Sequence, residues 1–443
     1  MRLTPRLPSR LRLPAGFIPR LPVPPRLPLA ITLTGTIGLL LVPAALLLLT
    51  PRRSASGLER LMPVAALLQS FPVQRGVAAP ALWRQRLGAA PAERAWSAQR
   101  RLWWQFWGAH GDAGAYLVLE ASPSQPLPAN ALRLDDLLVV APDPLARQLL
   151  QDQLRVRRRA PRGLALRCTE ALQQRQAVHW NAAALGRLLG PLAPLSQDLH
   201  QGCLVLAGEG RELRWQGEAD ASEGTQATAP PPLDAVVASP LQAGEWLDLR
   251  GRQLDLLLRG PLASPILRQA LAGTYGLGPD TLQTLRSAPF QLRLRPVERG
   301  AFLAGLELQI AAGDRRSQLE SWLRVLAGAL QEQGLSEGVP REGVTTWSRE
   351  DGTLVGGWRW LPGREELLLF LGPVPTRLPA SPSLGSEDWR LRVRPDAIAS
   401  SGLLPADLPP VVRRASQLEI RGRPLGSRAG ERQTSLAGRL ALP

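Results

Sequence analysis

The sequence predicts an α+β protein in which an N-terminal transmembrane helix precedes a degenerate, duplicated body of mostly antiparallel sheets with packed helices. Three observations lead to this fold class. One stretch near the N-terminus is long, apolar and uncharged, and the rest of the chain alternates strand-like runs with amphipathic helical ones. In addition, two segments of the body share the same pattern at the start of a helix.

The apolar stretch runs from Leu29 to Thr50 and holds 22 residues without a charge. At about 1.5 Å per residue a helix of this length reaches roughly 33 Å, which exceeds a hydrocarbon core of about 30 Å. Only a helix satisfies its own backbone in lipid, so residues 29–50 are predicted to span a membrane. A signal peptide cleaved near Ser54 to Ser56 and a buried core helix are the alternatives.

Residues 1–28 carry six arginines, eight prolines and no acid, a composition typical of a disordered basic tail. Three arginines follow the apolar stretch before residue 61. The positive-inside rule then predicts a single-pass protein with a cytoplasmic N-terminus and a body in the periplasm or a thylakoid lumen. The expected partners are the membrane and other envelope or membrane proteins.

The charge of the chain is concentrated at its start. All 53 basic residues are arginine, and the net charge is +16. Residues 1–60 hold nine Arg and one Glu, a net of +8, which leaves 44 Arg against 36 acids in the rest. The body is therefore only mildly basic, which argues against nucleic acid as a partner.

The body is predicted to form a first domain over residues 51–217, a polar linker over 218–232 and a second domain over 233–443. The two proposed copies share DPLARQLL at 143–150 and SPILRQAL at 264–271. Each begins with a capping residue and a proline and continues into Arg-Gln. This pairing predicts an internal duplication.

Periodicity assigns the elements of the body, with the helices expected on one face of the sheets. The predicted helices cover 92–107, 145–156, 266–271 and 317–330, and the predicted strands cover 116–120, 137–140, 254–258, 290–295, 302–311, 353–361 and 366–371. In the helix at 92–107 four tryptophans share one side. Such a stripe indicates core packing, with a membrane-interface helix as the alternative.

Two segments resemble a known family. LVVAPDP at 138–144 and HWNAAALGRLLG at 179–190 are similar to recurrent segments of uncharacterised single-span, membrane-anchored proteins of cyanobacteria. The resemblance implies a membrane-anchored α+β body in a bacterium. It implies no activity, cofactor or site residue.

Cys168 and Cys203 are the only cysteines. An even pair is consistent with one disulfide in an oxidising compartment, and two buried hydrophobic residues are the alternative. His179 and His200 complete a set of soft ligands, but the spacing of 11, 21 and 3 residues fits no standard zinc site. No metal site is therefore predicted.

Other motifs argue against several enzyme classes. Without lysine no Walker A loop exists, and no G-x-S-x-G nucleophile elbow, H-E-x-x-H or C-x-x-C is recognised. No catalytic residue and no cofactor are predicted. The strongest basic run contains Arg155, Arg157, Arg158, Arg159 and Arg162, and is either an anion-binding site or the solvated end of a helix.

These observations favour a membrane-anchored, extracytoplasmic binding or scaffold protein without catalytic activity. One alternative is an envelope enzyme whose active site matches no motif. The other is a cytoplasm-facing protein that binds polyanions through the arginines of residues 155–162.

Overall fold

A computed structural model describes most of the chain after residue 53. The described residues are 54–108, 114–121, 128–156, 160–181, 199–220, 240–259, 262, 264–298, 300–339, 341–377, 384–385, 387–404, 410–424 and 433–443. Residues 54–443 form one compact unit. Within it the mixture of eleven α-helices with mostly antiparallel sheet confirms the predicted α+β class for the described residues.

Eighteen described strands belong to one sheet. Those before residue 221 are β1 (Ala65–Pro72), β2 (Leu102–Gly108), β3 (Tyr116–Glu120), β4 (Ala131–Leu134), β5 (Leu137–Val140), β6 (Ala177–Trp180), β7 (Gln201–Glu209) and β8 (Glu212–Asp220). Those after residue 239 are β9 (Leu247–Gly251), β10 (Phe290–Pro296), β11 (Ala304–Ala311), β12 (Ser336–Glu337), β13 (Val344–Ser348), β14 (Leu354–Trp360), β15 (Glu366–Leu371), β16 (Trp389–Val393), β17 (Gln417–Pro424) and β18 (Gln433–Ala441).

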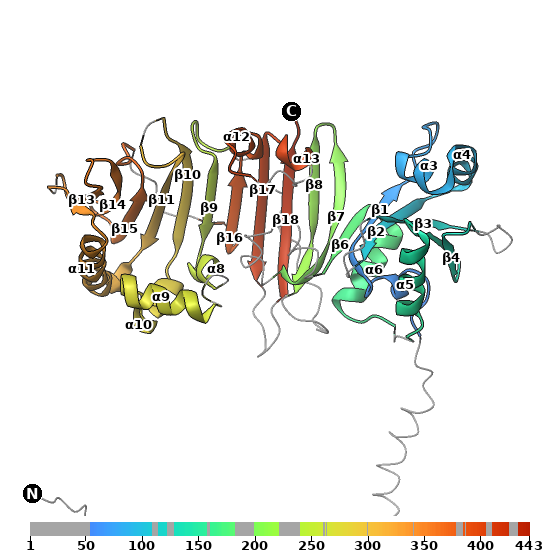
Figure 1. The fold of residues 1–443 in the computed structure, drawn as a ribbon, viewed down its shortest axis with the longest axis horizontal. Helices are drawn as coiled ribbons and strands as arrows, with labels where there is room; N and C mark the ends of the chain where they lie inside the picture. Colours follow the sequence, from blue (N-terminus) through green and yellow to red (C-terminus); the bar gives the residue numbers. More distant parts are fainter. Residues whose placement is uncertain are drawn as a thin grey trace, which may run out of the picture. The chain divides into compact units, whose positions relative to one another are not determined.

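The sheet is antiparallel at every described pairing. Hydrogen-bonded neighbours follow the order β4, β5, β3, β2, β1, β6, β7, β8, β18, β17, β16, β9, β10, β11, β15, β14, β13, β12. Strands β8, from the middle of the sequence, and β18, from its C-terminal end, lie side by side in the middle of the sheet (Figure 1). The sheet is therefore continuous across the predicted domain boundary, and Glu218 to Asp220 of the predicted linker belong to β8.

Eleven described helices precede or separate the strands. They are α2 (Leu58–Leu61), α3 (Ala81–Leu87), α4 (Ala89–Ala98), α5 (Pro144–Leu154), α6 (Leu164–Gln174), α8 (Asp255–Leu258), α9 (Pro265–Tyr275), α10 (Pro279–Arg286), α11 (Arg316–Glu332), α12 (Pro395–Ser400) and α13 (Pro410–Arg413). The two caps predicted in the repeated segments are present, since Asp143 accepts a hydrogen bond from the Ala146 N–H and Ser264 accepts one from the Leu267 N–H.

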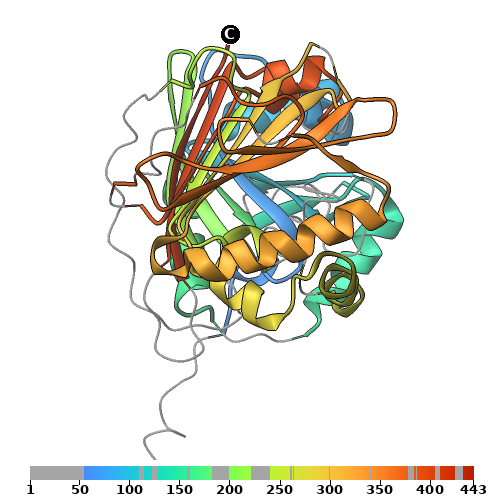
Figure 2. The ribbon, with the colours of Figure 1, turned by 90° about the vertical axis from the view of Figure 1, so that its left-hand side faces the viewer.

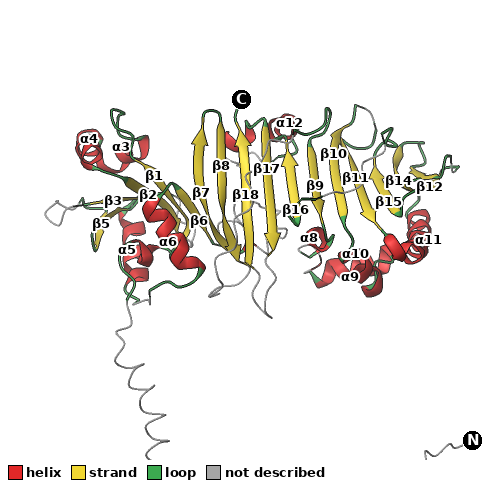
Figure 3. Cartoon of the chain, turned by 180° about the vertical axis from the view of Figure 1, so that it is seen from behind, coloured by secondary structure: helices red, strands yellow, loops and turns green. Residues whose placement is uncertain are grey.

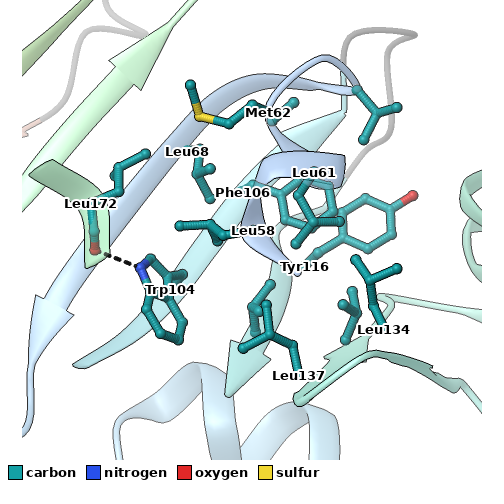
Figure 4. Close-up of a cluster of buried hydrophobic side chains, with 14 of the residues drawn as sticks. Leu58, Leu61, Met62, Leu68, Trp104, Phe106, Tyr116, Leu134, Leu137 and Leu172 are labelled. Atoms are coloured by element: carbon teal, nitrogen blue, oxygen red, sulfur yellow. Dashed lines mark hydrogen bonds between the residues drawn. The ribbon is translucent and has the colours of Figure 1, made fainter. Parts of the chain in front are cut away.

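Helices cover both faces of the sheet in the first half, rather than the one face predicted (Figure 3). On one face α5 and α6 pack over Leu68, Trp104 and Phe106 in an apolar core (Figure 4). On the other face α3 and α4 pack through Trp83 and Trp96. Antiparallel strands in this half therefore bury both of their faces, which explains why their hydrophobic pattern is nearly continuous.

The predicted helix at 92–107 is wrong beyond Ala98, where α4 ends and β2 begins at Leu102. Pairing of β2 with β1 and β3 overrides the helical spacing of the tryptophans. On a strand neighbouring side chains point to opposite faces. Accordingly Trp103 packs against Trp83 and Trp96, whereas the Trp104 indole donates to the Leu172 carbonyl on the other face (Figure 4).

The second half buries one face of the sheet beneath helices α8, α10 and α11, in a core centred on Phe290, Ile310 and Trp322. The predicted strand at 254–258 is wrong, because Asp255 to Leu258 form α8 in this core. The Leu254 N–H donates a hydrogen bond to the Ala288 carbonyl, and this bond is not part of a strand pairing.

The opposite face of the second half carries a row of buried charges. Glu307, Arg293, Asp248, Arg392, Glu419 and Arg439 lie directly opposite one another across six neighbouring strands. We call these six residues the charge ladder. Its signs alternate, and ion pairs join Glu307 to Arg293 at 2.6 Å, Asp248 to Arg392 at 3.1 Å and Glu419 to Arg439 at 3.3 Å.

The prediction of a single-pass membrane protein is corrected by the structure. No helix within the described ranges combines the length and the apolar character needed to cross a membrane. The membrane location inferred from the sequence is therefore not retained. The stretch from Leu29 to Thr50 and the tail at 1–28 lie outside the described residues.

Candidate functional site

An apolar groove lies between α11 and the outer strands of the second half. Its volume is about 290 Å³. Figure 2 shows α11, the long orange helix, running along this end of the sheet. The described lining residues come from β11, α11, the segment after it, β13, β14 and β15, and are Leu306, Leu308, Leu326, Leu330, Leu335, Trp347, Val355, Gly356, Gly357, Trp358, Leu369, Phe370 and Leu371.

Strand register explains why leucine and tryptophan side chains gather on one face. Leu306 pairs with Leu371, and Leu308 and Trp358 both pair with Leu369. Directly opposed residues share a face of an antiparallel sheet, so these side chains form one apolar surface. Leu326 and Leu330 are four residues apart on α11, so both side chains lie on the side of the helix that faces this apolar surface.

The hollow itself lies where a side chain is missing. Gly356 stands between Trp347 on β13 and Leu371 on β15 in the same row. A β-carbon at Gly356 would lie 2.3 Å from the Phe370 carbonyl oxygen, so only glycine fits this position. The sequence signal was the Gly-Gly pair at 356–357 between apolar residues, which sequence reasoning did not interpret.

The groove offers hydrocarbon surface and very little polarity. Its described lining contains no acid, base or nucleophile. The strands of its floor, β11, β15 and β14, are each paired on both sides, so their backbone groups are already bonded. Leu371 is 45% exposed and shows that the groove opens to solvent.

One polar atom in the lining is buried and has no hydrogen-bond partner, the indole nitrogen of Trp347. The ring of Trp347 packs against that of Trp358 with centroids 5.7 Å apart and planes tilted by 34°. Trp347 itself is 2% exposed. A buried donor without an acceptor destabilises the free protein, so this atom requires an explanation.

The two cysteines are joined by a disulfide. It links Cys168 on α6 to Cys203 on β7, with Cα atoms 5.6 Å apart. Both residues belong to the core beneath α6. Since their sulfurs are bonded to each other, they do not act as thiolate ligands, and no group of three or more His, Cys, Asp or Glu suited to a metal occurs within the described part of the chain.

His179 is buried beside this disulfide, opposite Cys203 on the neighbouring strand. Its Nδ1 lies 3.0 Å from the Gly202 carbonyl oxygen. Burial lowers the pKa of His179 to about 4, and the hydrogen bond to Gly202 opposes this shift only in part. The imidazole is therefore neutral at physiological pH and serves as a core residue.

This shift predicts acid sensitivity of the fold. The unfolded chain takes up a proton near pH 6.5, whereas the folded chain resists protonation down to about pH 4. Protonation of His179 therefore does not affect stability above pH 6.5. As the pH falls from 6.5 to 4 it lowers the free energy of unfolding, by about 2 kcal/mol at pH 5 relative to pH 7. Urea unfolding at pH 7 and pH 5 should therefore show that His179→Gln loses less stability on acidification than the unmodified protein, by about this amount. An equal loss in H179Q and in the unmodified protein would contradict the assignment.

The arginine run is only partly described. Arg155 ends α5 with a side chain that is 74% exposed, and it pairs with Asp152 at 3.2 Å. Arg162 is exposed, and Arg157, Arg158 and Arg159 lie outside the described residues. The described members thus do not converge on a defined anion site.

The prediction that the chain lacks a nucleophile-elbow motif is wrong. Residues 334–338 spell G-L-S-E-G, which matches the G-x-S-x-G pattern of serine hydrolases. That pattern is functional on a turn from a strand into a helix. Here the order is reversed, because Ser336 follows α11 and enters β12, so the serine is not held as a nucleophile.

Comparisons of the chain with protein-family models, with curated proteins and with solved structures find no match. The resemblance to cyanobacterial single-span proteins therefore remains a prediction from its two segments. Residues 182–190 of the second segment lie outside the described ranges. Among the described residues, the groove is therefore the feature that bears on function.

Proposed function

We propose that this protein is a non-catalytic binding protein that holds an apolar ligand in the groove beside α11. The observation that supports this most directly is an open, hydrocarbon-lined groove without any titratable group in its described lining. Burial of apolar ligand surface would supply the affinity, at roughly 25 cal/mol per Å² removed from water. Chemistry on the ligand would need acids, bases or nucleophiles that this lining does not offer.

The shape of the groove favours a hydrocarbon chain over an extended peptide. A volume of 290 Å³ is close to the lower limit of about 300 Å³ for ligand pockets. The floor strands are paired on both sides, so an extended peptide would bury backbone donors and acceptors without partners. A hydrocarbon chain carries no such cost.

Substitution at the mouth of the groove tests this proposal. Leu371→Glu places a carboxylate beside the bound chain, and Leu149→Glu on α5 is a matched control because both leucines are 45% exposed. Titration of the full chain with 11-(dansylamino)undecanoic acid should give a dissociation constant at least about tenfold higher for L371E, since burying a charge opposes binding. Equal affinity of both variants would show that the chain binds elsewhere.

We infer further that the body arose by duplication, with a strand correspondence that differs from the one predicted from the sequence. Helices α5 and α9, whose sequences predicted the repeat, are not equivalent in it, because α5 follows β5 whereas α9 follows β9 and precedes β10. Strand β1 lies between β2 and β6, as β9 lies between β10 and β16, and the hairpins β7–β8 and β17–β18 join the halves. An equivalent backbone hydrogen bond in each half supports this correspondence of strands. The Asn181 N–H donates to the Ala66 carbonyl in the first half, and the Arg394 N–H donates to the Trp246 carbonyl in the second. Helix α11 follows β11, whereas the described residues after β3 include no helix before β4, so the groove would belong to the second copy.

A further inference from the structure

We propose that the unpartnered indole N–H of Trp347 donates a hydrogen bond to a carbonyl oxygen of the ligand, so that the groove selects an acyl chain in an ester or amide rather than a plain hydrocarbon. This inference rests on the proposed function, because it assumes that the groove binds a chain. It adds the chemical class of the ligand and the residue that recognises it.

Other buried indoles of this protein show what such a group requires. The Nε1 atoms of Trp96, Trp104 and Trp180 each donate to a backbone carbonyl at 2.8 Å. The Nε1 of Trp322 donates to the Tyr275 carbonyl at 3.1 Å. A carbonyl oxygen is thus the usual acceptor for a buried indole in this fold, and Trp347 has the donor but no such acceptor.

Trp83 is the other described tryptophan whose buried Nε1 has no partner. Its ring meets those of Trp96 and Trp103 edge to face, at centroid distances of 5.1 and 5.7 Å. In that arrangement a neighbouring π face can receive an indole N–H. The rings of Trp347 and Trp358 are tilted by only 34°, so Trp347 lacks this compensation and instead lines the groove.

The remaining lining determines the rest of the ligand. Apart from the two indoles it consists of leucine, valine, phenylalanine and glycine, so the portion around the acceptor must be aliphatic. No arginine is present in the described lining to neutralise a carboxylate or phosphate buried there. Beside Trp347, a neutral ester or amide carbonyl on an alkyl chain therefore fits better than a buried carboxylate or phosphate.

A comparison of two single variants with two ligands, on the full chain, tests this assignment. Methyl octanoate and undecane have the same number of non-hydrogen atoms, and both can displace 11-(dansylamino)undecanoic acid. Trp347→Phe keeps an aromatic ring and removes the N–H, and Trp358→Phe is the control because that tryptophan also lines the groove. The ratio of ester to alkane dissociation constants should rise about fivefold in W347F and stay unchanged in W358F.

The failures are distinguishable. If neither ligand displaces the probe, the proposed function fails; if both do so and W347F leaves their ratio unchanged, only the carbonyl contact is overturned. A second readout does not depend on the stability of the variant. The indole N–H proton resonance of Trp347 should shift downfield when methyl octanoate is added and stay in place with undecane, and equal responses would contradict the proposal.

Discussion

Replacing Glu419 with alanine is expected to lower the free energy of unfolding by about 3–5 kcal/mol. Glu419 is 0% exposed and lies in the charge ladder between Arg392 and Arg439. Its carboxylate accepts from Arg421 at 2.8 Å and from Arg439 at 3.3 Å. Because both arginines would remain in a poorly solvated place without this carboxylate, the loss exceeds that of an ordinary ion pair.

An exposed pair gives the matched comparison. Glu320 and Arg316 also lie 2.8 Å apart, but their side chains are 47% and 43% exposed. Glu320→Ala should therefore cost no more than about 0.5 kcal/mol, as is usual for helical i,i+4 pairs in water. Urea unfolding of both variants measures the difference, and similar losses for E419A and E320A would mean that the ladder is hydrated rather than buried.

Reduction of the disulfide is expected to destabilise the fold by about 4 kcal/mol, the loop-closure value for cysteines separated by 35 residues. The bond ties α6 to β7 and thereby holds the helix that covers one face of the first half. The open chain would regain the conformational freedom that the closed loop excludes. A smaller loss would indicate that the unfolded chain stays compact in this region.

The measurement compares urea unfolding of the same protein with and without dithiothreitol. This comparison changes no side chain, so it separates the covalent link from packing. The double variant Cys168→Ala, Cys203→Ala should unfold at one urea concentration under both conditions. A reductant effect of equal size in that variant would show that dithiothreitol acts by another route.

Local interactions explain the elements that were predictable from sequence. Asp143 and Ser264 cap α5 and α9 because a short oxygen-bearing side chain reaches an N–H three residues ahead whatever the rest of the chain does. The hairpin of β10 and β11 follows from alternation over adjacent segments. These predictions needed no knowledge of distant residues.

The prediction of an element was wrong where contacts with distant residues outweighed the local spacing of apolar residues. The tryptophans of 96–107 have helical spacing, yet β2 forms because β1 and β3 pair with it on both sides. The helices α3 and α4 then bury Trp103 while α6 receives Trp104. Sequence periodicity could not reveal that the strand between them is covered on both faces.

The charge ladder and the groove depend on pairing between remote segments. Asp248, Arg392, Glu419 and Arg439 come from four strands that span nearly two hundred residues, and each looks solvent-exposed in an alternating strand. The groove needs Gly356 beside Leu371 and beneath α11. Composition, helix caps and strand or helix character are properties of short stretches and follow from the amino-acid order. The burial of a side chain, its partner in an ion pair and the groove arise only when the register of a large antiparallel sheet brings those stretches together.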